Sequence, residues 1–180
     1  MSKTAVIYKS TYGTTRTYAE QIAQELGAYL IECKKTKISE LVRYDTIIFG
    51  GGIYAGKIAG SGLIRKCFEK SKGKHLVVFS VGFTPHARTD ILDKVRLSSF
   101  KADQIKNINF FHFRGGVDYK KLNLFHRFLI FTKRLLISIQ PESKLTNDNK
   151  RFLKLYGKSI ELAYESPKVL ITYVKGIHSF

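Results

Sequence analysis

Two kinds of apolar pattern alternate along the chain. Continuous apolar runs, typical of buried strands, occupy residues 4–9, 29–33, 45–49, 75–81 and 105–113. Helical spacing or helix-forming composition follows these runs in residues 14–26, 38–42, 61–70, 88–97 and 147–164. Strands and helices in this order predict an α/β fold, a doubly wound parallel sheet of five strands with helices on both faces.

The length and the cysteines narrow the class of protein further. A chain of 180 residues forms one domain with a sizeable core, and its first residues are those of a strand rather than a secretion signal. Cys33 and Cys67 lie far apart and lack metal-ligand spacing. We therefore expect reduced thiols in a cytoplasmic protein and no metal site.

The charge is unusual. The chain has 31 Lys and Arg against 14 Asp and Glu, a formal net charge of +17. Such a field attracts polyanions, which means nucleic acid, anionic lipid or an anionic substrate. No nucleic-acid recognition motif accompanies it, so nucleic acid is the least favoured of the three.

Ligands of open parallel sheets bind beyond the carboxyl ends of the strands, and the first such loop has the composition of a phosphate site. Four of its six residues carry Ser or Thr hydroxyls, a glycine permits close backbone approach, and a helix start follows; the residues are Ser10, Thr11, Tyr12, Gly13, Thr14 and Thr15. No lysine follows the glycine and no GxGxxG is present, which argues against the nucleotide loops of those types. The alternative is an ordinary helix cap.

The loops after the third and fourth strands are rich in glycine and carry aromatic residues. The loop after the third strand comprises Gly52, Ile53, Tyr54, Ala55 and Gly56, and its Tyr54 offers a flat face for a planar ring. The other comprises Ser80, Val81, Gly82 and Phe83. An ordinary glycine-rich turn with a surface tyrosine remains the alternative for the loop after the third strand, and His86 is either a surface histidine or a proton donor.

Ser-x-Tyr-Gly-x-Thr in the first loop resembles the flavodoxin phosphate loop, with Tyr12 in place of a threonine. The resemblance implies strand order 2-1-3-4-5 and FMN as cofactor. It also implies that the first loop holds the FMN phosphate, that Tyr54 stacks on the flavin, and that Gly82 and Phe83 cover its other side, with Ser80 nearby.

Residues 114–140 are too long for an ordinary connection and form an insertion before the last helix. A basic stripe there includes Arg127, Lys133 and Arg134, and apolar residues lie largely opposite it. These interior charges argue against a bilayer-spanning helix. The apolar face instead packs on its own domain, packs on a second subunit in a homodimer, or lies on an anionic membrane surface through residues 120–140.

A narrower resemblance is to the menaquinone-dependent, flavodoxin-type protoporphyrinogen dehydrogenases. It rests on residues 10–16, Tyr-Asp at 44–45, residues 53–56, Ser-Val at 80–81, Ala-Arg at 87–88 and the basic aromatic insertion with Phe-His-Arg-Phe at 125–128; residues 82–86 depart from the family pattern. It implies an FMN oxidoreductase of heme biosynthesis, peripheral on the inner face of the cell membrane, that passes electrons from protoporphyrinogen IX to menaquinone.

Residue roles within this enzyme remain open. Arg88, Arg114, Lys120 and Arg127 either attract propionates or lipid or are ordinary solvated charges, and no catalytic acid or base is assigned. Two other functions remain: a basic flavodoxin that carries electrons, and a module without cofactor that binds lipid or nucleic acid. A colourless protein that takes up no FMN would exclude the enzyme and the carrier alike.

Overall fold

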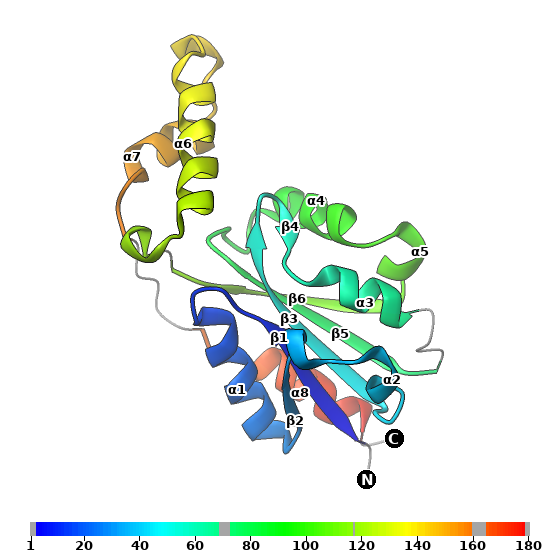
Figure 1. The fold of residues 1–180 in the computed structure, drawn as a ribbon. Helices are drawn as coiled ribbons and strands as arrows, with labels where there is room; N and C mark the ends of the chain where they lie inside the picture. The colour runs from blue at the N-terminus through cyan, green and yellow to red at the C-terminus, as the bar shows by residue number, and fades with distance from the viewer. Residues whose placement is uncertain (1–2, 69–72, 117, 160–164, 179–180) are drawn as a thin grey trace. The chain divides into compact units, whose positions relative to one another are not determined.

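A computed structural model describes residues 3–68, 73–116, 118–159 and 165–178. The chain divides into two compact units (Figure 1). Met1–Gly115 and Ala163–Phe180 form the sheet unit, and Gly116–Leu162 form the inserted unit. Each unit is described by itself below.

The sheet unit is built on five parallel strands. These are β1 (Thr4–Lys9), β2 (Tyr29–Glu32), β3 (Thr46–Tyr54), β5 (His75–Gly82) and β6 (Ile108–Arg114), in the order β2-β1-β3-β5-β6. A short strand, β4 (Lys57–Ile58), pairs antiparallel with the end of β3. The predicted α/β fold and the order 2-1-3-4-5 are confirmed, with β4 as an addition.

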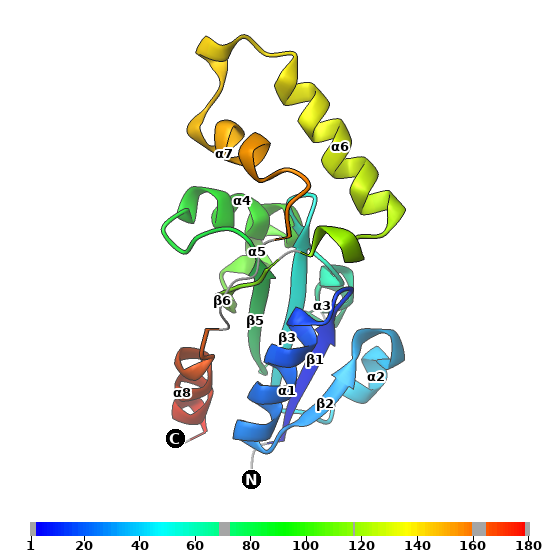
Figure 2. The same cartoon turned by 90° about the vertical axis from the view of Figure 1, so that its left-hand side faces the viewer.

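Helices cover both faces of this sheet (Figure 2). One face carries α1 (Thr14–Leu26) and α8 (Lys168–Ile177), whose buried side chains include Tyr18, Ile22 and Leu170. The other carries α2 (Ile38–Leu41), α3 (Ser61–Phe68), α4 (Thr89–Ser99) and α5 (Ala102–Ile105), and the short 3-10 turn η1 (Cys33–Lys35) follows β2. Two apolar layers therefore hold the sheet on both sides, as its continuous apolar strands require.

Strand β3 continues beyond Phe49, where the sequence analysis ended it. Gly50, Gly51 and Gly52 are strand residues paired with β5 rather than the start of a loop. A Cβ on Gly50 would lie 2.0 Å from Cζ of Phe79, so the large ring on β5 needs a bare backbone beside it. The glycine run was misinterpreted because its cause is a packing neighbour in another strand.

The C-terminal part also differs from the prediction. The helix expected over residues 147–164 ends at Leu155 as α7 (Asn147–Leu155), and it belongs to the inserted unit. Residues 160–164, like the last two residues of the helix expected over 61–70, lie outside the described residues. The segment left as a tail after Pro167 forms α8 and contributes Leu170, Ile171 and Val174 to the core.

In residues 118–159, the part of the inserted unit that the structure describes, there are two helices and two 3-10 turns. These are η2 (Tyr119–Lys121), α6 (Leu124–Ser138), η3 (Glu142–Lys144) and α7. Asn123 caps α6 by accepting from the amide of His126 at 2.8 Å, and Thr146 caps α7 by accepting from the amide of Asn149 at 3.2 Å. Such caps satisfy amides that a helix start leaves without partners.

Candidate functional site

Strand register gathers the three predicted loops at one edge of the sheet. Lys9 pairs with Gly51, Gly51 with Ser80, and Gly82 with Arg114. The carboxyl ends of the four strands therefore lie side by side, at the place where ligands of such sheets bind.

The first loop is shaped to receive an anion at the start of α1. Gly13 has φ +98°, which favours glycine, and its amide donates to Ser10 Oγ at 3.1 Å. Among the described residues no side chain caps α1, and its first turn holds no acidic residue. A Cβ on Gly13 would meet nothing within 4 Å, so there is open space beside these amides. A phosphate group fits this arrangement.

Tyr54 joins the second loop to the first. Its ring packs over Gly52, where a Cβ would lie 2.8 Å from Tyr54 Cε2, and its side chain hydrogen-bonds Thr11. The Tyr12 ring lies edge-on to it, with centroids 6.1 Å apart. Burial raises the pKa of the Tyr54 phenol, although the bond from Thr11 opposes this. Tyr12, the position that departs from the family pattern, thus extends the aromatic surface of Tyr54.

The turn after Tyr54 is a tight β-hairpin. Ala55 (φ +48°) and Gly56 (φ +74°) connect β3 to β4, and both are in the left-handed region that two-residue hairpin turns use. The predicted second loop is therefore partly strand (Gly52, Ile53 and Tyr54) and partly this turn.

The third predicted segment lies against the second. A Cβ on Gly82 would lie 3.0 Å from Ile53 Cδ1, which places the two segments in direct contact. Ser80 and Val81 are buried, with 6% and 5% of their surface exposed. Their side chains therefore pack inside the sheet unit. Gly82 is the last residue of β5, and the half-buried Phe83 follows it in the loop.

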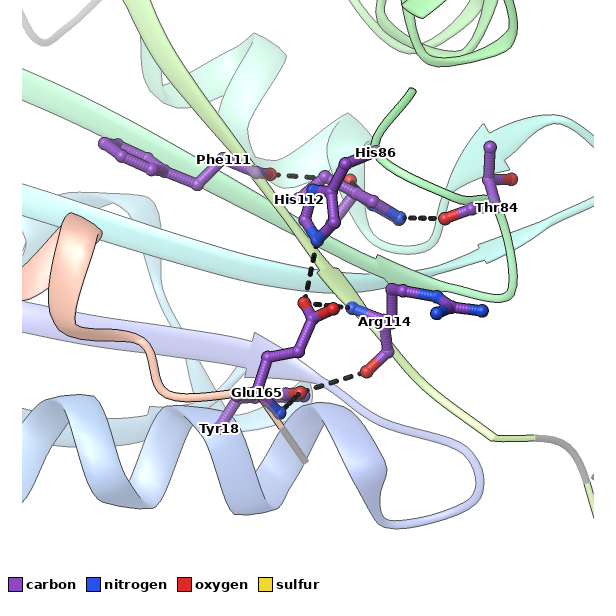
Figure 3. Close-up of polar contacts among 8 residues, drawn as sticks. Tyr18, Thr84, His86, Phe111, His112, Arg114 and Glu165 are labelled. Carbon is purple, nitrogen blue, oxygen red and sulfur yellow. Dashed lines mark hydrogen bonds and ion pairs between the residues drawn. The ribbon is translucent and has the colours of Figure 1, made fainter. Parts of the chain in front are cut away.

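The structure adds a polar network that the sequence analysis missed (Figure 3). His112 on β6 lies between Ser80 and the loop that follows β5: its Nε2 donates to the Thr84 carbonyl at 2.8 Å, and Ser80 Oγ is 2.9 Å from its Nδ1. Burial lowers the pKa of His112, although the bond to the Thr84 carbonyl opposes this. A neutral His112 ring with its proton on Nε2 donates to the Thr84 carbonyl and accepts at Nδ1 from the Ser80 hydroxyl.

Glu165 is the second centre of this network. Its Oε2 accepts from His86 Nε2 at 2.8 Å and from the Arg114 amide at 3.1 Å. Its own amide donates to the Tyr18 hydroxyl at 2.9 Å, and that hydroxyl donates to the Arg114 carbonyl at 2.9 Å. Burial raises the pKa of Glu165, but the bonds from His86 and Arg114 outweigh this and leave it below the usual value.

Sequence signals for this network are weak. Ser80 and His112 are cross-strand partners, so a polar pair on two neighbouring apolar strands was the one available sign. Glu165 lies 79 residues from His86 and 51 from Arg114, and no local pattern joins them.

In the inserted unit, the basic stripe of α6 packs against aromatic rings. Arg134 lies 4.5 Å from the Tyr156 ring centroid, and Lys133 lies 4.7 Å from that of Phe152. Arg127 lies 5.4 Å from the ring centroid of Tyr119. Cation–π contacts of this kind hold the helix to the rest of its unit. Lys133 and Arg134 are themselves exposed, so the stripe contacts these rings on one side and solvent on the other.

The apolar face of α6 is also exposed. Its exposed fractions run from 48% at Phe131 to 83% at Leu124; the members are Leu124, Phe125, Phe128, Phe131, Leu135, Leu136 and Ile139. We call these seven residues the α6 face. Contiguous exposed apolar patches on soluble domains are typical of interaction surfaces.

The described residues contain neither a membrane-spanning helix nor a metal-binding cluster. None of the helices in 3–68, 73–116, 118–159 or 165–178 is long and apolar enough to span a bilayer. Within the same ranges, His, Cys, Asp and Glu side chains form no group of three or more that could hold a metal ion.

Known structures and sequence families resemble the chain as follows. A flavodoxin from the Archaea is 21% identical, with 61% of this chain and 84% of that one covered and a TM-score of 0.42. A WrbA-like flavodoxin from Agrobacterium tumefaciens is also 21% identical, with 61% and 76% covered and a TM-score of 0.45. No curated protein matches. The flavodoxin-domain model matches residues 5–135, so the chain belongs to the flavodoxin-domain family, whose cofactor is FMN.

Proposed function

We propose that this protein is an FMN-dependent oxidoreductase that takes electrons from protoporphyrinogen IX and passes them to menaquinone at an anionic membrane surface. The observation that carries the FMN part is the start of α1, where amides without a side-chain cap, the Ser10 hydroxyl and open space at Gly13 meet. The substrate rests on the resemblance of residues 10–16 and 125–128 and on the charge of +17.

The loop before α1 holds the FMN phosphate. Ser10, Thr11, Gly13, Thr14 and Thr15 bind the phosphate through hydroxyls and amides, because they surround the positive end of α1.

The ring of the cofactor has its own set of contacts. Tyr12 and Tyr54 offer one aromatic surface, and Gly82 and Phe83 offer the other side. When bound, FMN supplies one- and two-electron redox chemistry, and the protein orients it and shields it from water.

Anionic substrate groups have a nearby cation. Arg114 ends β6 beside the loops, and its Nε is buried with no hydrogen-bond partner among the described residues. A buried guanidinium nitrogen without a partner costs free energy, which a carboxylate would recover. A porphyrinogen propionate has this chemistry.

The α6 face supports contact with lipid. Full removal of one Leu or Phe side chain from water is worth about 1.5–3 kcal/mol, so even shallow burial of several favours the membrane interface. The α6 face is the surface that enters the lipid, and Lys133 and Arg134, which pack on rings but remain exposed, stay on the water side of the helix. The proposed enzyme therefore works as a peripheral protein at the inner face of the cell membrane.

The enzyme proposal is tested by cofactor extraction and turnover. The purified protein should be yellow, release FMN on denaturation, and oxidise protoporphyrinogen IX with a menaquinone analogue as acceptor. A yellow protein that oxidises no porphyrinogen but exchanges electrons with other flavoproteins would be a carrier. A colourless protein that takes up no FMN would refute both.

Lipid contact is tested by vesicle co-sedimentation with mixed phosphatidylserine and phosphatidylcholine. Phe128→Asp and Phe131→Asp should reduce binding, because each places a charge in the α6 face. Leu97→Asp, at a 64% exposed position on α4, is the matched control and should bind like the parent. Equal binding by all variants would refute the role of α6, and a dimer–monomer change in Phe128→Asp would assign the face to a second copy.

A further inference from the structure

Glu165 lies where three parts of the sheet unit meet. Its Oε2 contacts His86, in the loop after β5, at 2.8 Å, and accepts from the Arg114 amide at the end of β6 at 3.1 Å (Figure 3). Its amide donates to Tyr18 on α1, whose hydroxyl also donates to the Arg114 carbonyl. One carboxylate and one phenol thus join a helix, the edge strand and a loop.

These hydrogen bonds lie at the two chain boundaries of the inserted unit. Arg114 is the last residue of β6, directly before the boundary of the inserted unit at Gly115, and Glu165 follows the other boundary at Ala163. The Tyr18 hydroxyl therefore joins the two chain segments that lead into and out of the inserted unit. The same Glu165 carboxylate reaches the loop that carries Phe83.

The loop after β5 depends on polar ties. His112 donates to the Thr84 carbonyl at 2.8 Å, and Glu165 accepts from His86. A cavity of about 240 Å³ lies beside these ties, lined by His86, His112, Ser80, Leu92 and Phe110 among others. The two ties therefore anchor the loop at the rim of this pocket.

Among the residues that the structure describes, four charged or titratable groups act on or touch Glu165, and one of them is the Tyr18 hydroxyl that accepts from its amide. His86 approaches from the loop, and Arg114 and His112 approach from β6. The His86 and His112 rings lie edge to face with centroids 5.4 Å apart. Glu165 is the acid among them, so its removal leaves His86 without its carboxylate partner.

We propose that Glu165 is a positioning residue of the flavin site, which holds the loop carrying Phe83 against FMN through His86 and ties that loop to the exit of the inserted unit. This inference rests on the FMN site assigned above. Glu165 touches neither cofactor nor substrate in this role, and it acts by restricting the loop to the geometry that binds the flavin.

The test is a double-mutant cycle on FMN affinity, read by quenching of flavin fluorescence. Glu165→Ala and His86→Ala should each weaken FMN binding by about tenfold, the value of one charge-assisted hydrogen bond. The double variant should be no weaker than the worse single variant, because both remove the same tie. Glu165→Gln keeps a hydrogen-bonding amide and should recover part of the affinity.

Glu142→Ala is the matched control, because it removes a glutamate carboxylate from the exposed Lys150–Glu142 pair of the inserted unit. It should leave FMN affinity and the visible circular dichroism of bound flavin unchanged, whereas Glu165→Ala should alter both. A lower melting temperature with unchanged affinity and dichroism in Glu165→Ala would overturn the inference, as would independent, multiplying effects in the cycle. A parent protein that binds no FMN would instead overturn the site itself.

Discussion

The Tyr18 hydroxyl joins the two chain segments that bracket the inserted unit, and Tyr18→Phe removes only that oxygen. The Tyr18 side chain is fully buried and its ring stacks on Phe113, with centroids 4.9 Å apart and planes 18° apart. Phenylalanine keeps this ring contact. The substitution therefore isolates the two hydrogen bonds to Glu165 and Arg114.

The expected cost follows from the groups left behind. The Glu165 amide loses its acceptor and the Arg114 carbonyl loses a donor. An unsatisfied buried polar group costs about 1–3 kcal/mol, and both groups are only partly buried, so water recovers some of this. We expect the free energy of unfolding to fall by about 2 kcal/mol, which at a urea m-value of about 2 kcal/mol/M lowers the midpoint by about 1 M.

Urea unfolding of the apo protein, followed by far-ultraviolet circular dichroism, measures this shift. Tyr29→Phe is the control, since Tyr29 is 59% exposed on β2, and its free energy of unfolding should stay within about 0.5 kcal/mol of the parent. Equal midpoints for the Tyr18 and Tyr29 variants would refute the reasoning and show that the bridge contributes no stability.

Three further predictions concern the backbone at the strand ends and the buried histidine. Gly50→Ala should lower the free energy of unfolding by about 1–3 kcal/mol or more, because its Cβ would lie 2.0 Å from the Phe79 ring, and adding Phe79→Leu should restore part of the urea midpoint. Gly13→Ala should weaken FMN binding about tenfold in a fluorescence titration, because φ +98° is strained for alanine by about 1–3 kcal/mol, whereas Gly73→Ala, at φ +80° just before the amino end of β5, should leave FMN affinity unchanged. His112 has a pKa below its unfolded value of about 6.5, so its contribution to stability is complete above that pH and is lost as the pH falls toward the folded pKa; the urea midpoint of the parent should drop between pH 7.5 and 5.5 more than that of His112→Gln, and equal drops would contradict the assignment.

The inserted unit shows how a correct pattern can leave its orientation open. The sequence placed Arg127, Lys133 and Arg134 on one stripe of a helix with apolar residues opposite, and α6 has this arrangement. Which face packs inward depends on the partners. Aromatic residues of the same unit, such as Phe152 and Tyr156, take the cations, and the apolar side is left exposed.

The polar network around Glu165 marks a second limit of sequence reasoning. Tyr18 is a fully buried residue of α1, yet its hydroxyl bridges Glu165 and Arg114, and no pattern in the sequence indicates this bridge. His86 was left between a surface residue and a proton donor, and the structure gives it a carboxylate partner 79 residues away. Contacts over such distances depend on the order in which strands and helices come together.

The sequence by itself determined the alternation of strands and helices and the hydroxyl-rich turn at Ser10, because apolar period and turn chemistry act within a few residues, and the strand order followed only from the flavodoxin resemblance. Only the tertiary structure decided that Gly50 is a strand residue beneath Phe79, that α8 completes the core, and that Glu165 and His112 hold the loop after β5. The physical reason is that these features follow from which surfaces meet, and a buried ring, a bare backbone or a shared carboxylate is specified by a neighbour distant in the chain.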